Sequence, residues 1–96
     1  MNLIESLLMW ASSLSPWLEG QGVELASGSS PTDILRRSAW VNLRRGDREA
    51  ELILWESGEA EFSASDPNGG VTQQHYEIEN PARLASVLLR LLESIT

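Results

Sequence analysis

The chain begins and ends with segments whose apolar residues recur at helical spacing. Over residues 2–19, the repeat of Leu3, Leu7, Trp10 and Leu14 predicts a helix. Pro16 is expected to kink that helix or to end it near residue 15. A second helix is predicted from residue 80, where Asn is suited to the N-cap and the following Pro to the first helical position. Its apolar stripe consists of Leu84, Val87, Leu88, Leu91, Leu92 and Ile95.

Between these helices, apolar and polar residues alternate along segments that end at turn sequences. Residues 45–48 (RGDR) predict a two-residue hairpin of type II′ with Gly46 first. Residues 56–58 (ESG) predict a three-residue loop with Gly58 in the left-handed bulge position. Residues 66–70 (DPNGG) predict a further turn. A strand is expected over residues 71–79, a short strand over 23–27 and a loop over 28–32, whereas residues 33–37 receive no assignment.

The two glycine turns fix which side chains share a face of the predicted sheet. The register places one set of apolar residues together: Ala39, Val41, Leu43, Ala50, Leu52, Leu54, Ala60, Phe62 and Ala64. Tyr76 and Ile78 are expected to join them. Two helices side by side would cover about the width of a four- or five-stranded sheet. We therefore predict an α+β fold over residues 1–96, a single domain in which an N-terminal and a C-terminal helix pack on one face of an antiparallel meander.

The opposite face of that sheet is expected to lack a cover and to carry aromatic and acidic side chains. Exposed aromatic area with a charged rim is typical of protein-binding sites. An equally good interpretation is that the tryptophans form a second small core or are covered by a dimer partner. A two-residue turn at 56–58 would instead turn Trp55 into the core. The predicted partner-binding residues are Trp40, Ile53, Trp55, Glu59, Glu61, His75 and Glu77.

Length and charge narrow the classes of partner. The chain has 96 residues, enough for one domain, and a net charge of −7, which disfavours binding to a nucleic-acid backbone. Between Glu49 and Glu79 there are eight carboxylates and no Lys or Arg. Such segregated charge can steer a basic partner, although acidic strands also simply favour solubility. No uncharged apolar run approaches ~18 residues, so no membrane span is predicted.

Catalytic interpretations of the same residues are weak. Glu59 and Glu61 would lie roughly 6.7 Å apart at ~3.3 Å per residue, a separation also found in inverting glycosidases. Any two acids at positions i and i+2 of a strand have this separation, so it is not evidence for catalysis. His75 beside Glu61 could resemble a base and its orienting group, but no nucleophile has a supporting motif. With one His and no Cys, a transition-metal site is not expected. We predict a protein without enzymatic activity or cofactor.

Three blocks of the sequence resemble the TriTu family of bacterial immunity proteins. They are SAWV at residues 38–41, LILWESGEAE at 52–61 and HYEI at 75–78. The order of these blocks and the terminal helices extend the resemblance over most of the chain. It implies a cytoplasmic, non-enzymatic antitoxin that binds and blocks a cognate ADP-ribosyltransferase toxin domain, which is delivered by type VI secretion and modifies elongation factor Tu. Inhibition would occur by occlusion of the NAD or substrate site. It does not imply which residues make contact.

Two other functions fit the same size, acidity and exposed patch. A chaperone or adaptor for a secreted effector would bind a different protein through it. A self-associating structural protein would use the tryptophan face as its dimer interface. The free chain is accordingly expected to be a monomer or a weak homodimer, and an affinity pull-down would discriminate between these functions.

Overall fold

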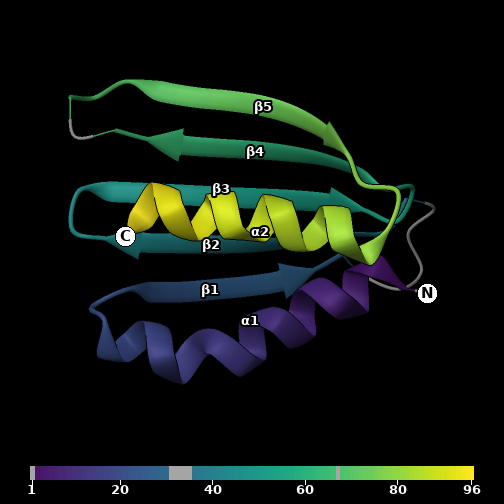
Figure 1. Ribbon diagram of the computed structural model, residues 1–96, viewed down its shortest axis with the longest axis horizontal. Helices are drawn as coiled ribbons and strands as arrows, with labels where there is room; N and C mark the ends of the chain where they lie inside the picture. The colour runs from purple at the N-terminus through teal and green to yellow at the C-terminus, as the bar shows by residue number, and fades with distance from the viewer. Residues whose placement is uncertain (1, 31–35, 67) are drawn as a thin grey trace.

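Five antiparallel strands, hydrogen-bonded in chain order, lie between two helices in the computed structural model (Figure 1). The structure describes residues 2–30, 36–66 and 68–96. The elements are α1 (Leu3–Gly20), β1 (Glu24–Ser29), β2 (Ser38–Arg45), β3 (Arg48–Trp55), β4 (Glu59–Ser65), β5 (Val71–Glu77) and α2 (Pro81–Ile95). The predicted α+β fold with a four- or five-stranded antiparallel sheet is confirmed, and the sheet has five strands.

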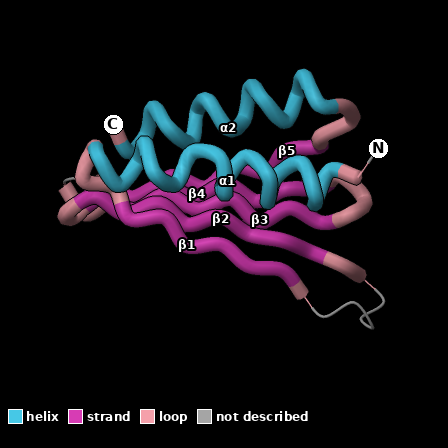
Figure 2. The backbone as a smooth tube through the Cα atoms, turned by 90° about the horizontal axis from the view of Figure 1, so that it is seen from below, coloured by secondary structure: helices cyan, strands magenta, loops and turns pink. Residues whose placement is uncertain are grey.

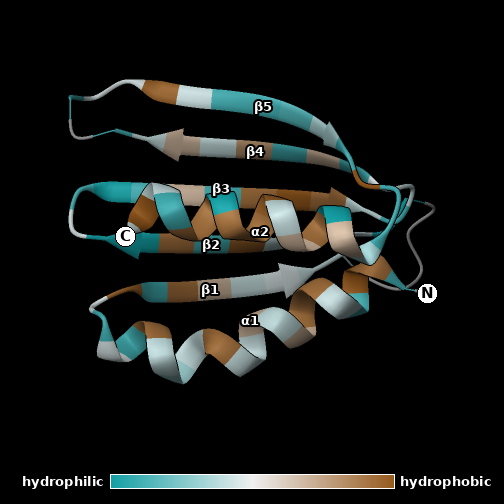
Figure 3. Cartoon of the chain, in the orientation of Figure 1, coloured by the Kyte–Doolittle hydropathy of each residue, from teal (hydrophilic) through white to brown (hydrophobic). Residues whose placement is uncertain are grey.

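Both helices lie on the same face of the sheet (Figure 2). α1 packs on β1 and β2, and α2 packs on β2, β3 and β4. The buried apolar residues of both helices pack into one core with those of the strands. The hydropathy colouring shows that apolar and polar residues alternate along each helix (Figure 3). Every residue predicted for the covered face is buried, except Ala64, which is partly buried. Tyr76 and Ile78 join this core as expected.

The helices do not cover the full width of the sheet. In Figure 1, α2 lies over the middle strands and β5 lies beyond it. On the helix side of β5, Thr72 is exposed and Gln74 is only half-buried. The helices therefore fall short of the expected cover at β5, where only the end near Tyr76 is buried. α1 lies along β1, at the opposite edge of the sheet, so only one helix is left for the remaining strands.

Both glycine turns have the predicted geometry. Gly46 has φ 60° and Gly58 has φ 97°, whereas no non-glycine residue in the described segments has a positive φ. Asp47 therefore fits type II′, in which only the first central residue needs a positive φ. The predicted pairs are all present, including Val41 with Leu52. The three-residue loop keeps Trp55 on the face opposite the core.

Gly58 is required for a second reason. Its carbonyl oxygen accepts a hydrogen bond of 2.7 Å from the backbone N–H of Ile78. A Cβ atom at position 58 would lie 2.5 Å from the carbonyl oxygen of Ile78. Because no real Cβ atom approaches backbone so closely, only glycine allows the β3–β4 loop to pack against the segment that leads from β5 into α2.

The ends of the helices are specified locally. The Asn2 side chain caps α1 by accepting from two backbone N–H groups, and Asn80 caps α2 in the predicted way, with Pro81 following. α1 ends in a Schellman motif, because the N–H of Val23 donates to the carbonyl of Leu18 and Gly22 has φ 77°.

Of the two outcomes expected at Pro16, an end near residue 15 is not found, since α1 continues through Pro16 to Gly20. Ala11 before the proline and Leu18 after it are both buried against the sheet. Pro16 itself is exposed, as is Ser12, whose carbonyl loses its helical donor. Water can satisfy that carbonyl, so packing on both sides of the proline decides the outcome.

β1 extends to Ser29, two residues beyond the predicted strand, so Gly28 and Ser29 pair with β2 instead of starting a loop. The remainder of the predicted loop from residue 31, and residues 33–35, lie outside the described residues. β5 ends at Glu77, two residues earlier than predicted. Within the described residues, neither helix has the length and apolarity needed to cross a membrane.

Candidate functional site: the open face of the sheet

All seven predicted partner-binding residues lie on the sheet face that is turned away from the helices. A row across four strands runs from Trp40 through Ile53 and Glu61 to His75, each directly opposite the next. The remaining three lie in the neighbouring row, towards the β3–β4 loop. We call this surface the open face, and its residues are Trp40, Ile53, Trp55, Glu59, Glu61, His75 and Glu77.

The aromatic residues of the open face are neither fully buried nor fully extended into solvent. Trp40 is 36% exposed, whereas Ile53 and Trp55 are half-buried. The indole of Trp40 packs over Gly28 of the adjacent strand. None of the described helices and strands covers these side chains, so in the described part of the chain they do not form a closed second core.

Arg36 is a member of this surface that the sequence did not indicate. Its guanidinium carbon lies 4.8 Å from the centroid of the Trp55 ring, and its Nη2 atom forms an ion pair with Glu59. No pattern in the sequence connects Arg36 with Glu59, which is 23 positions away. The contact arises because the segment before β2 lies beside the β3–β4 loop, where the carbonyl of Arg37 accepts from the N–H of Glu56.

His75 and Glu61 form the pair that the strand register predicts. The His75 Nδ1 atom lies 2.7 Å from Oε1 of Glu61. This hydrogen bond is the main reason why the pKa of His75 is raised above 6.5, and the charges of Glu61, Glu59 and Glu77 add to it while desolvation opposes it. Protonation of His75 makes the centre of the open face less negative as the pH falls, and the raised pKa means that this happens at a higher pH than for an ordinary histidine.

Other members of the eight carboxylates between Glu49 and Glu79 form contacts within the chain. Glu49 forms an ion pair with Arg44 at 2.7 Å, and this hydrogen bond lowers the pKa of Glu49. Glu51 accepts a hydrogen bond from Asn42 at 3.2 Å. Asp66 holds the β4–β5 turn by accepting from two backbone N–H groups. On the open face, Glu59 is likewise paired with Arg36 and Glu61 with His75, so Glu77 is the one carboxylate of the three without an ion pair to a described residue.

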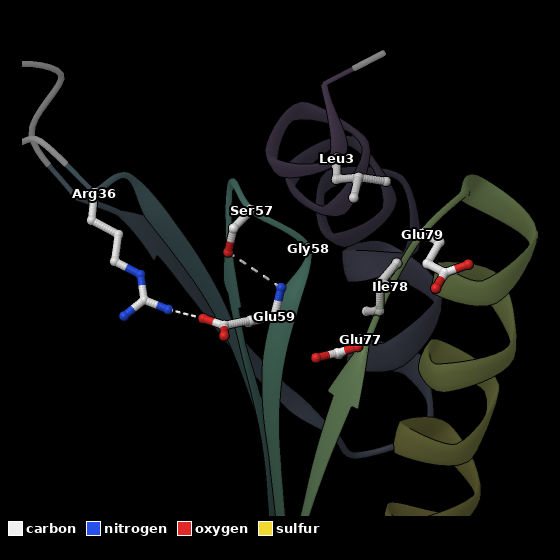
Figure 4. Close-up of a pocket in the computed structure, with 8 residues that line it drawn as sticks. All are labelled: Leu3, Arg36, Ser57, Gly58, Glu59, Glu77, Ile78 and Glu79. Atoms are coloured by element: carbon white, nitrogen blue, oxygen red, sulfur yellow. Dashed lines mark hydrogen bonds and ion pairs between the residues drawn. The ribbon is translucent and has the colours of Figure 1, made fainter.

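A hollow of about 650 Å³ lies at one end of the open face (Figure 4). Glu59 and Glu77 face each other across β4 and β5, a like-charged pair that is unfavourable by itself. Neither Glu77 nor Glu79 forms an ion pair with any described residue. The described residues contain no metal-binding cluster of three His, Cys, Asp or Glu side chains. The lining residues are Leu3, Arg36, Ser57, Gly58, Glu59, Glu77, Ile78 and Glu79.

A family model described as immunity protein TriTu matches residues 5–94, from the first turn of α1 to the last turn of α2. The chain belongs to the TriTu family of immunity proteins. The resemblance recognised in the three sequence blocks is thereby confirmed. Neither the curated proteins nor the solved structures contain a match to the chain. As a TriTu immunity protein it has an antitoxin role, and its partner is a toxin protein.

Proposed function

We propose that this TriTu protein binds a cognate ADP-ribosyltransferase toxin domain through the open face and blocks its NAD or substrate site. The target of the toxin would be elongation factor Tu, and the toxin would arrive by type VI secretion, so that protection takes place in the cytoplasm. The observation that carries the proposal is a sheet face, without a cover from any described element, on which two tryptophans adjoin three carboxylates.

The charge on the open face suits the proposed target. A site that binds the anionic NAD molecule has to be electropositive, and Glu59, Glu61 and Glu77 offer the opposite charge. Complementary charge accelerates encounter and fixes orientation. The partly buried tryptophans supply the apolar area that holds a complex together, because aromatic anchors at the centre of an interface dominate its binding energy.

The whole sheet face turned away from the helices, of which the open face is a part, is also of adequate size. Five strands at ~4.8 Å and seven residues at ~3.3 Å each give a plane of roughly 24 Å by 23 Å. Side-chain relief increases this area towards the ~800 Å² per partner that a stable complex buries. A face of this size can occupy the toxin site.

Inhibition by occupancy would be stoichiometric. It would not remove ADP-ribose from an already modified target.

An activity titration tests the proposal. The catalytic domain of the cognate toxin would be purified and assayed for transfer of labelled ADP-ribose from NAD to elongation factor Tu. We expect activity to fall to background at about one equivalent of the immunity protein. A parallel sample of already modified elongation factor Tu should keep its label. Full toxin activity in the presence of excess immunity protein, or loss of label from the modified target, would contradict the proposal.

A further inference from the structure

We propose that Trp55 and Glu59 form a guanidinium-binding site that Arg36 fills in the free protein and that an arginine of the toxin fills in the complex. The identity of the incoming group as a toxin arginine rests on the proposed function. The site itself does not, because it is visible in the free chain and can be tested without any toxin.

The first support is that the site already holds a guanidinium group. The Trp55 ring lies under the Arg36 guanidinium while the Glu59 carboxylate accepts from its edge. An aromatic face and a carboxylate are the two surfaces that a planar guanidinium binds best, and an ammonium group matches them less well. The Arg36 side chain is 57% exposed and that of Glu59 43% exposed, so the site is open to a partner from solvent.

The second support is a surplus of negative charge around the site. Among the described residues that line the hollow beside it, Glu59, Glu77 and Glu79 are acidic and only Arg36 is cationic. Glu77 lies directly across from Glu59 in the sheet and has no ion pair with a described residue. A partner arginine that enters between these two carboxylates would be held by both, whereas Arg36 pairs with Glu59 alone.

The third support is that Arg36 can leave at little cost to the fold. It precedes β2, so its side chain is not part of the sheet. The backbone beside it remains fixed, because the Arg37 carbonyl accepts from the Glu56 N–H at 2.9 Å. Exposed ion pairs contribute little to stability, so a better-held guanidinium can displace this one.

The exchange predicts that removal of Arg36 opens the site to a small probe. The probe is N-acetyl-arginine amide, and binding would be followed by NMR at the Trp55 indole N–H and the Glu59 amide. If Arg36 occupies the site in nine of ten molecules, the apparent dissociation constant of the wild type is about tenfold higher than that of Arg36→Ala. The matched control is Arg48→Ala, which removes the same charge from the exposed β2–β3 hairpin and should behave like the wild type.

Two further binding measurements define the site. Adding Glu59→Gln to the Arg36→Ala variant should abolish saturable binding, and N-acetyl-lysine amide should bind the Arg36→Ala variant more weakly than the arginine probe does. Equal affinity of the wild type and Arg36→Ala would show that Arg36 does not occupy a guanidinium site. Equal binding of the lysine probe would show only general attraction of cations. Either result would overturn the proposal, provided that the thermal midpoint of Arg36→Ala shows it to be folded.

Binding and inhibition measurements with the toxin then distinguish this inference from the proposed function. If the arginine probe binds as expected but Glu59→Gln leaves toxin binding unchanged, the exchange with a toxin arginine is wrong although the guanidinium site exists. If the probe does not bind but the immunity protein still blocks the toxin, the proposed function stands without this site. If the toxin is not blocked at all, the proposed function fails, and the probe result alone decides whether the guanidinium site is retained.

Discussion

The indole of Trp40 packs against the backbone of Gly28, so closely that a Cβ atom on Gly28 would lie 2.8 Å from Cζ2 of the ring. Glycine within a strand gives no side chain to the sheet, and an aromatic ring on the neighbouring strand can cover the gap. In this pair the glycine also sets the position of Trp40, which rests on β1 instead of projecting from the open face.

Gly28→Ala should therefore move the Trp40 indole away from β1. The stability should change little, because the atoms in the way belong to the end of a side chain that is 36% exposed. The measurement is the resonance of the Trp40 indole N–H, together with the thermal midpoint. Gly20→Ala is the matched control, since no atom lies within 4 Å of its added Cβ. An unchanged Trp40 resonance in Gly28→Ala would contradict the packing described.

Gly58→Ala should destabilise the fold through both backbone strain and a clash. A positive φ costs a non-glycine residue about 1–3 kcal/mol, and the approach to the Ile78 carbonyl adds to that. Gly69→Ala provides the comparison, because Gly69 has φ 86° but open space around its added Cβ. Urea denaturation should give the larger loss for Gly58→Ala. Equal losses would mean that the contact with Ile78 does not matter.

Leu54→Ala should lower the free energy of unfolding by about 2–5 kcal/mol, because Leu54 is fully buried under the helices. Ile53→Ala, one residue earlier in β3, should cost less because Ile53 is only half-buried on the open face. Chemical denaturation measures both. A neutral Leu54→Ala, or a reversed order of the two variants, would contradict the assignment of faces.

The pair of His75 and Glu61 predicts a pH dependence with a definite sign. Because the folded pKa of His75 is raised above 6.5, its contribution to stability is fully present below that value and is lost as the pH rises through the folded pKa. The stability of the wild type relative to His75→Ala should thus be greater at about pH 5.5 than near pH 9. NMR titration should show that Glu61→Gln lowers the His75 pKa. A His75 pKa at or below 6.5 in the wild type would refute the effect.

Charge reversal and anchor removal on the open face should affect different rate constants. Glu59→Lys with Glu61→Lys should slow toxin association at low salt by at least about tenfold, since charge governs encounter. Trp55→Ala should mainly raise the dissociation rate, by about thirtyfold if it removes about 2 kcal/mol. Surface plasmon resonance at two salt concentrations measures both rate constants.

The matched control for that experiment lies on the helix side of the protein. Glu19→Lys with Glu93→Lys makes the same change of charge at exposed positions of α1 and α2. We expect this control to associate nearly as fast as the wild type. If wild-type association does not respond to salt and the reversal at Glu59 and Glu61 still protects cells, the open face is not the contact surface.

The strands were predictable because two glycines fix their register independently and agree. Gly46 and Gly58 each require one type of turn, and a one-residue error at either would have placed alternate leucines in solvent. An end of the helix near residue 15 was a wrong expectation, because local propensity at Pro16 indicates a break whereas burial on both sides of the proline keeps the helix continuous. Gly28 looked like a loop residue because the ring that covers it comes from the next strand.

The open face was predictable as a surface but not in its internal contacts. The alternation along β3, β4 and β5 was enough to bring Ile53, Glu61 and His75 into one row. The contact of Arg36 with Trp55 and Glu59 depends on how an irregular segment passes the sheet, and periodicity carries no information about that path. Which open-face residues touch a toxin therefore stays a prediction.

In β3, Leu52 and Leu54 face the helices, whereas Ile53 and Trp55, which alternate with them, face outward. If the open face binds the toxin as proposed, selection for stability and selection for recognition act on adjacent codons without competing for the same positions. A substitution that alters recognition need not pass through a misfolded intermediate, and one that repairs the core need not change the partner. An antitoxin built in this way can follow a diversifying toxin, and a designer could randomise the outward positions of a single strand while the scaffold remains intact.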